Sequence, residues 1–171
     1  MSEAGFAFRV DAADVDEAVL ADEAPETYVA RVALAKARAV AARHAPEAVI
    51  LAADTTVAID GEILGKPMDG GDAARMLSRL SGTAHDVWTA VVVKRGDAER
   101  TEVVRTRVHF LPLSSSDLTW YVGTGEPDGK AGAYAIQGLG ARFVDRIEGS
   151  WSNVVGLPVA TVHQMLKKVG A

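Results

Sequence analysis

The chain has 171 residues, a formal net charge of −5 and no cysteine. This length allows one domain, residues 1–171, with a substantial core. The acidic balance argues against a generally basic surface for duplex nucleic acid, and the absence of thiols excludes disulfides, a cysteine nucleophile and a zinc–thiolate site. Neither a basic–apolar leader nor a bilayer-length apolar run is recognisable, so we expect a cytoplasmic protein without membrane or nucleic-acid partners.

The first elements in chain order are a strand, a loop and a helix. Phe6–Val10 has the pattern of a short strand, and an acidic loop follows from Asp11 to Glu26. Apolar residues at helical spacing in an alanine-rich stretch predict a long helix over Pro25–His44.

The next segment places a carboxylate inside an apolar strand. Residues 48–53 form an uninterrupted apolar run, typical of a strand covered on both faces, and the strand continues through Asp54 to Ile59. An ionised aspartate there is costly to desolvate unless cations, a metal or amide donors compensate. Lys36 and Lys66 are the candidate cations. A structural aspartate that bonds local backbone groups is the alternative.

Asp60-Gly61 predicts a tight hairpin, with Glu62–Gly65 as the return strand. An ideal turn puts Lys66 opposite Thr55, and a one-residue bulge puts it one residue further on. Either register brings Lys66 near Asp54. A carboxylate beside a lysine suits metal-assisted phosphate chemistry, although a solvated surface lysine is an equal alternative.

The rest of the chain mixes helices with hairpin-linked strands. Helices are expected over Asp72–Leu80, from the capping box at Ser114–Asp117 to Val122, and from Pro158 onward; strands are expected over His85–Lys94, Glu99–Leu111 and Ala141–Ile147. This order predicts an α/β fold with a mixed, twisted sheet flanked by helices.

The segment Gly123–Gly140 has six glycines in eighteen residues and can approach a ligand closely. Lys130 offers a phosphate contact. The Gln137 amide can match the N3–H donor and a carbonyl acceptor of uracil or thymine. A surface loop with turn glycines is the alternative.

An acidic cluster at Asp14–Glu17 could supply a ligand to a hard cation, but taken alone it is typical of a solvated loop. The four histidines lack metal-ligand spacing and are expected to be structural or at the surface.

Eight segments, in order, resemble the Maf family of nucleoside triphosphate pyrophosphatases, which is related to the inosine triphosphatase fold. They are Tyr28 with Ala33–Ala37, Ala53-Asp54-Thr55, Ile63–Pro67, Leu80-Ser81-Gly82, Gly125-Glu126-Pro127, Lys130–Tyr134, Ile136-Gln137-Gly138 and Ile147–Pro158.

The resemblance implies cleavage of a nucleoside triphosphate between its α- and β-phosphates, giving the monophosphate and pyrophosphate with a divalent cation, Mg²⁺ or Mn²⁺. Asp54 matches the family's proton-accepting aspartate. Glu17, Lys36 and Lys66 match charged residues around the triphosphate and metal, and Asp54 and Glu17 are the expected metal ligands. A homodimer is a further expectation from the family.

Thr55 and Gln137 match positions tied to substrate choice. The Ala-Asp-Thr and Ile-Gln-Gly forms resemble the branch that acts on dTTP and UTP, rather than the branch that prefers 7-methyl-GTP. The resemblance therefore implies an enzyme that removes unwanted or modified pyrimidine nucleotides.

Family members open with a strand and a Ser-x-Ser-Pro-Arg-Arg segment, which this sequence does not contain. We expect either that the start was assigned too far downstream or that part of the phosphate-binding segment is missing. Loss of such an arginine would cost about 3 kcal/mol of transition-state stabilisation. An impaired or non-catalytic nucleotide-binding protein, or a cell-division regulator, is therefore the alternative function.

Overall fold

The computed structural model describes residues 1 and 5–170. The helices are α1 (Pro25–Ala41), α2 (Gly70–Leu80), α3 (Ser115–Val122), α4 (Trp151–Val154) and α5 (Val159–Lys168), with 3₁₀ turns at Ala131–Ala133 and Leu139–Phe143. The strands are β1 (Ile50–Ile59), β2 (Glu62–Leu64), β3 (Ala84–Arg95), β4 (Ala98–Phe110) and β5 (Val144–Glu148). None of the described helices is both long and apolar enough to span a bilayer.

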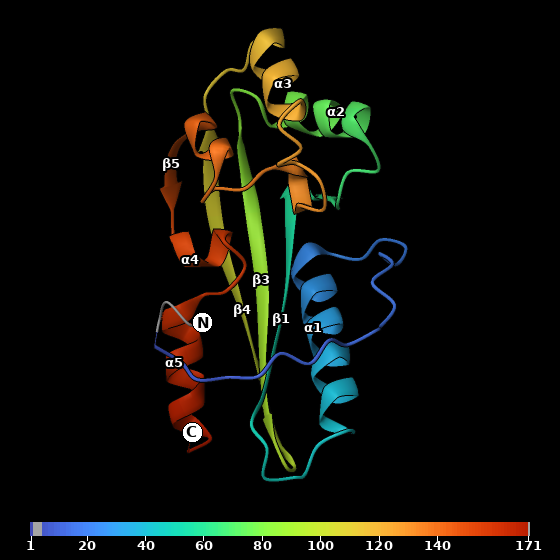
Figure 1. Ribbon diagram of the computed structural model, residues 1–171, viewed down its shortest axis with the longest axis vertical. Coiled ribbons are helices and arrows are strands. Elements are labelled where there is room, and N and C mark those ends of the chain that lie inside the picture. The colour runs from blue at the N-terminus through green and yellow to red at the C-terminus, as the bar shows by residue number, and fades with distance from the viewer. Residues whose placement is uncertain (2–4, 171) are drawn as a thin grey trace.

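The five strands form one sheet in the order β2-β1-β3-β4-β5 (Figure 1). This confirms the predicted α/β class, a sheet flanked by helices. The expected mixture of strand directions is not found, because all four described strand pairs are antiparallel. Tight hairpins join β1 to β2 and β3 to β4, and a strand that returns through a two-residue turn must pair antiparallel.

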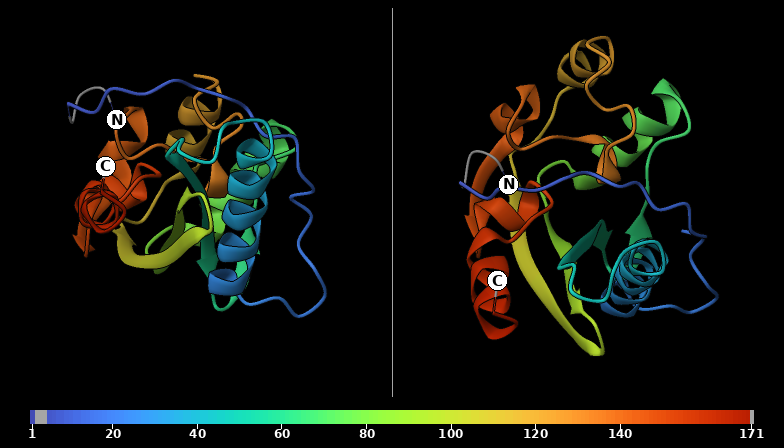
Figure 2. Two further views of the ribbon diagram at one scale, coloured as in Figure 1. Left: turned by 90° about the horizontal axis from the view of Figure 1, so that it is seen from below. Right: turned by 60° about the horizontal axis from the view of Figure 1, so that its bottom comes forward.

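The central strand β3 is buried on both faces, and its alternating side chains contact different helices. Ala90 and Val92 pack in the cluster that includes α1, whereas Val91 and Val93 pack with Val162 and Met165 of α5. Figure 2 shows α1 and α5 on opposite sides of the sheet. An apolar run without alternation is expected for a strand covered on both faces.

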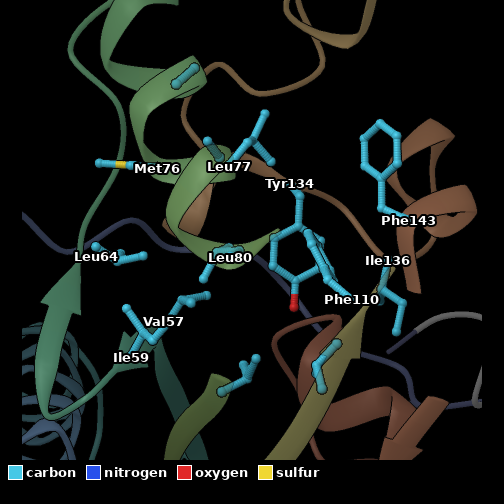
Figure 3. Packing of buried hydrophobic residues seen from close by; sticks show 14 of the residues in the cluster. Val57, Ile59, Leu64, Met76, Leu77, Leu80, Phe110, Tyr134, Ile136 and Phe143 are labelled. Atoms are coloured by element: carbon cyan, nitrogen blue, oxygen red, sulfur yellow. The ribbon is translucent and has the colours of Figure 1, made fainter. Parts of the chain in front are cut away.

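A larger core cluster lies at the other end of the sheet, where α2, α3 and the glycine-rich segment meet the strands (Figure 3). Leu77 and Leu80 of α2 are fully buried in it. Tyr134 packs edge-on against Phe110, with ring centroids 4.8 Å apart. This cluster anchors the glycine-rich segment to the sheet.

The strand predicted at Phe6–Val10 is wrong, since these residues have no regular structure and no sheet partner. Phe8 is 49% exposed and Val10 is 86% exposed, so no apolar face is available to hold a strand. In Figures 1 and 2 the chain that runs through this segment into the acidic loop crosses from beside α5 to beside α1. The expected helix over Pro25–His44 is confirmed but ends at Ala41.

Candidate active site

Asp54 lies in the middle of β1, opposite Ala90 of β3. The short strand β2 pairs only with Val57–Ile59, so within the described residues no strand pairs with β1 at Asp54 on that side. Only 9% of the aspartate is exposed. The strand thus holds a carboxylate inside the fold, beside a sheet edge that a ligand can approach.

Lys36 joins this carboxylate to a second predicted site residue, Glu17. Lys36 of α1 places its Nζ 2.7 Å from Asp54 Oδ1 and 2.6 Å from Glu17 Oε1. Lys66 Nζ lies 3.7 Å from Glu17 Oε2. The expected pairing of Asp54 with Lys36 is therefore confirmed, whereas Lys66 makes its ion pair with Glu17.

The protonation behaviour of the two carboxyls differs because their surroundings differ. Burial raises the pKa of Asp54 and outweighs the opposing hydrogen bond from Lys36. The hydrogen bond from Lys36 lowers the pKa of Glu17. A carboxylate with a raised pKa is a better proton acceptor, so Asp54 is the stronger base of the pair.

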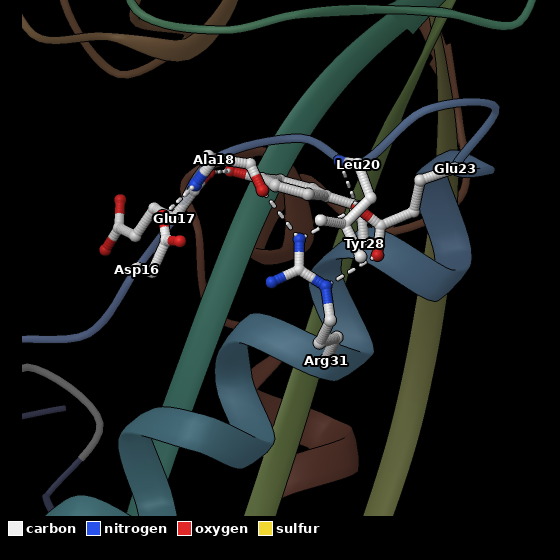
Figure 4. A network of polar contacts seen from close by, with 7 residues as sticks. All are labelled: Asp16, Glu17, Ala18, Leu20, Glu23, Tyr28 and Arg31. Carbon is white, nitrogen blue, oxygen red and sulfur yellow. Dashed lines mark hydrogen bonds and ion pairs between the residues drawn. The ribbon is translucent and has the colours of Figure 1, made fainter.

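Side chains of α1 fix the backbone around Glu17, although the acidic loop has no regular secondary structure (Figure 4). The Tyr28 hydroxyl donates to the Glu17 carbonyl over 3.1 Å. Arg31 donates to the Ala18 carbonyl and to both carboxylate oxygens of Glu23, at 2.6 to 2.8 Å. Helix α1 thus positions Glu17 as well as carrying Lys36.

A cavity of about 250 Å³ adjoins Asp54. Besides Asp54, four predicted site residues line it, from β1, from the segment after β2 and from the glycine-rich segment: Thr55, Lys66, Lys130 and Gln137. Gln137 and Lys130 are exposed, so both can contact a ligand. The cavity therefore has one carboxylate, two ammonium groups and one free amide around it.

Close packing holds Lys130 at the cavity wall. Gly132 has a φ of 66°, and a Cβ built on it would lie 2.9 Å from three side-chain atoms of Val57. Its N–H also donates to the Gly65 carbonyl over 3.0 Å. Only glycine fits this conformation and this contact without strain, so the segment can lie directly on β1.

A network of hydroxyl groups that was not predicted from the sequence lies behind the cavity. Thr55 Oγ1 lies 2.9 Å from Thr89 Oγ1, which also donates to the Asn153 carbonyl. The Asn153 side chain in turn donates to the Val87 carbonyl and to Thr106. The available signal was a threonine inside an otherwise apolar strand. This network links Thr55 to the segment Val154–Gly156, which forms another wall of the cavity.

Asp54 and Glu17 have a chemistry that fits a hard divalent cation. Asp54 Oδ2 is buried and accepts no hydrogen bond from the described residues. Among those residues no group of three or more histidine, aspartate or glutamate side chains could hold a metal alone. Mg²⁺ typically takes one or two carboxylates and completes its shell with water and substrate phosphates, and these two carboxylates could serve such a cation.

The structure thus brings all seven predicted site residues to one region, whereas Asp14 and Asp16 of the acidic cluster make no ion pair there among the described residues. The protein is therefore an α/β protein whose pocket has a buried carboxylate, two lysines and an exposed amide. Such a pocket suits an anionic ligand that also carries a ring with hydrogen-bonding groups.

Comparison with known proteins agrees with that description. The family model described as "Maf-like protein" matches residues 1–169, and the chain belongs to this family. A dTTP/UTP pyrophosphatase of Myxococcus xanthus is 55% identical over 95% of this chain and 82% of its own length. Proteins of the same name from Anaeromyxobacter dehalogenans and Geotalea uraniireducens are 51% and 50% identical, over 99% and 100% of this chain and 87% and 89% of their own lengths.

Proposed function

We propose that this protein is a hydrolase that cleaves dTTP and UTP between the α- and β-phosphates, releasing the nucleoside monophosphate and pyrophosphate, and so removes unwanted or modified nucleotides. One observation carries the proposal: a buried carboxylate, Asp54, keeps one oxygen on Lys36 and the other without a hydrogen-bond partner among the described residues, beside the cavity. The names of the relatives support the choice of substrate.

Asp54 takes the proton from the attacking water, a role suited to its raised pKa. Lys66 and Lys130 neutralise phosphate oxygens at the cavity. Lys36 holds the Asp54 and Glu17 side chains in place. Each lysine acts as a point charge, which suits the spread of charge over a transferring phosphate.

Gln137 reads the base, because an amide can accept from the N3–H of uracil or thymine and donate to the adjacent carbonyl. Thr55, which also lines the cavity, contributes to substrate choice. An amide that is held in this orientation would face an acceptor at N3 and a donor at N4 in cytosine, and both groups would be unmatched.

A divalent cation, Mg²⁺ or Mn²⁺, would be held by Asp54 and Glu17 together with substrate oxygens. When bound, it would polarise the phosphates and offset their charge. A single domain over residues 1–171, a homodimer and a cytoplasmic location remain predictions.

The test is turnover of dTTP and UTP with Mg²⁺ by the purified protein and by Asp54→Asn. The unsubstituted protein should yield dTMP and UMP, identified by chromatography, with pyrophosphate measured as phosphate after treatment with inorganic pyrophosphatase. Asp54→Asn should lower kcat about 100-fold to 10,000-fold, the range that a positioned general base supplies.

Asp86→Asn is the matched control, because Asp86 is a β3 aspartate paired with Arg105 outside the cavity. It should keep the original rate. Release of dTDP and phosphate, or full activity of Asp54→Asn, would contradict the proposal. Thermal stabilisation by dTTP without any turnover would instead favour a nucleotide-binding protein.

A further inference from the structure

Gln137 lies at the tip of a short loop, Ala135–Gly140, that reaches the cavity. No hydrogen bond to its own side chain is formed by the described residues, and its position therefore depends on how the loop backbone is held. Groups on both sides of the glutamine fix that backbone.

A single carboxylate holds the far side of the loop. Glu126 accepts from the Leu139 N–H over 2.8 Å and from the Gly140 N–H over 2.9 Å. The same carboxylate accepts from the Tyr121 hydroxyl over 2.8 Å. Three donors therefore converge on two carboxylate oxygens.

The near side of the loop is held through the same tyrosine. The Ala135 N–H donates to the Tyr121 hydroxyl over 3.2 Å, and this hydroxyl in turn donates a hydrogen bond to Glu126. Tyr121 is fully buried at the end of α3, so the hydroxyl has a fixed position. Both ends of the loop that carries Gln137 are thus tied to one acid.

The loop glycines leave room for this arrangement. A Cβ on Gly138 would overlap the Glu126 carboxylate. A Cβ on Gly140 would lie 2.7 Å from the Tyr121 hydroxyl oxygen. Gly138 and Gly140, on either side of Leu139, are therefore required by the close approach of Glu126 and Tyr121 to the loop.

The ionised state of Glu126 suits this role. Burial opposes ionisation, but the hydrogen bonds from Leu139, Gly140 and Tyr121, together with the charge of Lys130, outweigh it and lower the pKa of this carboxyl. An ionised carboxylate only accepts, which matches three donors. A glutamine here would keep one oxygen and turn an N–H₂ group toward a backbone N–H, leaving a donor unmatched.

We infer that Glu126, through Tyr121, is a positioning residue for base recognition: it fixes the loop Ala135–Gly140 so that the Gln137 amide meets the pyrimidine edge. The inference rests on the proposed function and extends it to a residue that lies outside the cavity lining. Among the described residues the hydrogen-bond partners of Glu126 are Tyr121 and the loop backbone, not Asp54, so its loss should change discrimination between bases more than the chemical step.

The experiment compares kcat/KM for dTTP and for CTP in Glu126→Gln, Gln137→Ala and the double variant. Glu126→Gln should reduce the dTTP-to-CTP ratio about tenfold, mainly through a raised KM for dTTP. If Glu126 acts through Gln137, the double variant should discriminate no worse than Gln137→Ala alone, because the two effects are not additive. Tyr121→Phe, which keeps the buried ring, should shift the ratio in the same direction.

Asp117→Asn is the matched control, because Asp117 likewise accepts from a backbone N–H and a hydroxyl, at the other end of α3. It should leave the ratio unchanged. An unchanged ratio in Glu126→Gln, or additive effects in the double variant, would overturn the inference while dTTP turnover by the unsubstituted protein still supported the proposed function.

Amide hydrogen exchange tests whether Glu126 holds the loop without any measurement of enzyme activity. Amides of residues 135–140 should exchange faster in Glu126→Gln than in the unsubstituted protein, and should be unaffected in Asp117→Asn. Unchanged protection would show that the acid does not hold the loop. Absence of nucleotide turnover in the unsubstituted protein would count against the proposed function alone, because this measurement needs no substrate.

Discussion

At the scale of single residues, His85 is a buried titratable group that the proposed chemistry does not use. Its Nε2 lies 2.9 Å from the Tyr134 hydroxyl, and its ring packs edge-on against Phe110 with centroids 4.9 Å apart. Burial lowers the pKa of His85 to about 4. The histidine is thus neutral in the fold at neutral pH, and it supports Tyr134 at the cavity wall.

This burial predicts a loss of stability in mild acid. The unfolded chain takes up a proton on His85 near pH 6.5, whereas the folded protein does so only near pH 4. Stability from this residue is therefore complete above about pH 6.5 and falls as the pH drops toward 4. Between pH 7 and pH 5 the loss should be about 2 kcal/mol, measured by urea unfolding.

His85→Gln should remove this part of the pH dependence, because glutamine can still bond Tyr134 but does not titrate. His163→Gln, at the surface of α5, should behave like the unsubstituted protein. Equal pH slopes for His85→Gln and the unsubstituted protein would contradict the prediction.

At the scale of elements, α1 organises one side of the site. It carries Lys36 to Asp54, and with Tyr28 and Arg31 it holds the backbone around Glu17 (Figure 4). The hydrogen bond from Arg31 lowers the pKa of Glu23 to about 2, so the pair stays charged at neutral and mildly acidic pH. One helix therefore supplies a site lysine and positions a carboxylate from an irregular loop.

We expect Arg31→Ala to release the loop and weaken the contribution of Glu17 to cation binding. The Mg²⁺ concentration for half-maximal dTTP turnover should rise about tenfold, as found for residues that support metal ligands, while kcat at saturating Mg²⁺ stays close to the original. Arg38→Ala is the matched control. Arg38 lies on the same helix as Arg31 and likewise donates two hydrogen bonds to a glutamate, Glu99 of β4, away from Glu17. An equal effect of both substitutions would rule out a specific role for Arg31.

At the scale of the whole molecule, the cavity joins parts of the chain that are distant in sequence. Its walls come from β1, the segment after β2, the glycine-rich segment and the segment Val154–Gly156. A ligand bound there contacts elements from both halves of the chain. Since such a site cannot exist in the unfolded chain, binding should stabilise the fold as a unit.

Nucleotide binding should therefore raise the melting temperature of Asp54→Asn, in which the expected loss of kcat slows consumption of the nucleotide. At a dTTP concentration of 100 Kd with Mg²⁺, the free energy of unfolding should rise by about 2.7 kcal/mol. Differential scanning calorimetry measures it, and adding Gln137→Ala should shrink the shift for dTTP but not for CTP. The same shift for both nucleotides in Asp54→Asn would contradict base recognition by Gln137.

The predictions from sequence succeeded where a local pattern has a local cause. The capping box at Ser114 forms, and the turn at Asp60-Gly61 joins β1 to β2 in the register predicted for an ideal hairpin. The apolar period within Pro25–His44 predicted a helix, which α1 confirms up to Ala41, because helical spacing alone creates its buried face. The strand at Phe6–Val10 failed because strands need a partner, and no described strand pairs with it.

The sequence by itself determined that a carboxylate lies in a β-strand near lysines, and that a glycine-rich segment carries an amide and a further lysine. Only the tertiary structure decided that Lys36 bridges Asp54 and Glu17, that Thr89 contacts Thr55, and that Glu126 holds the loop around Gln137. The reason is physical: these contacts join residues from 13 to 34 positions apart or lie across the sheet, so they depend on how the layers pack rather than on any local period.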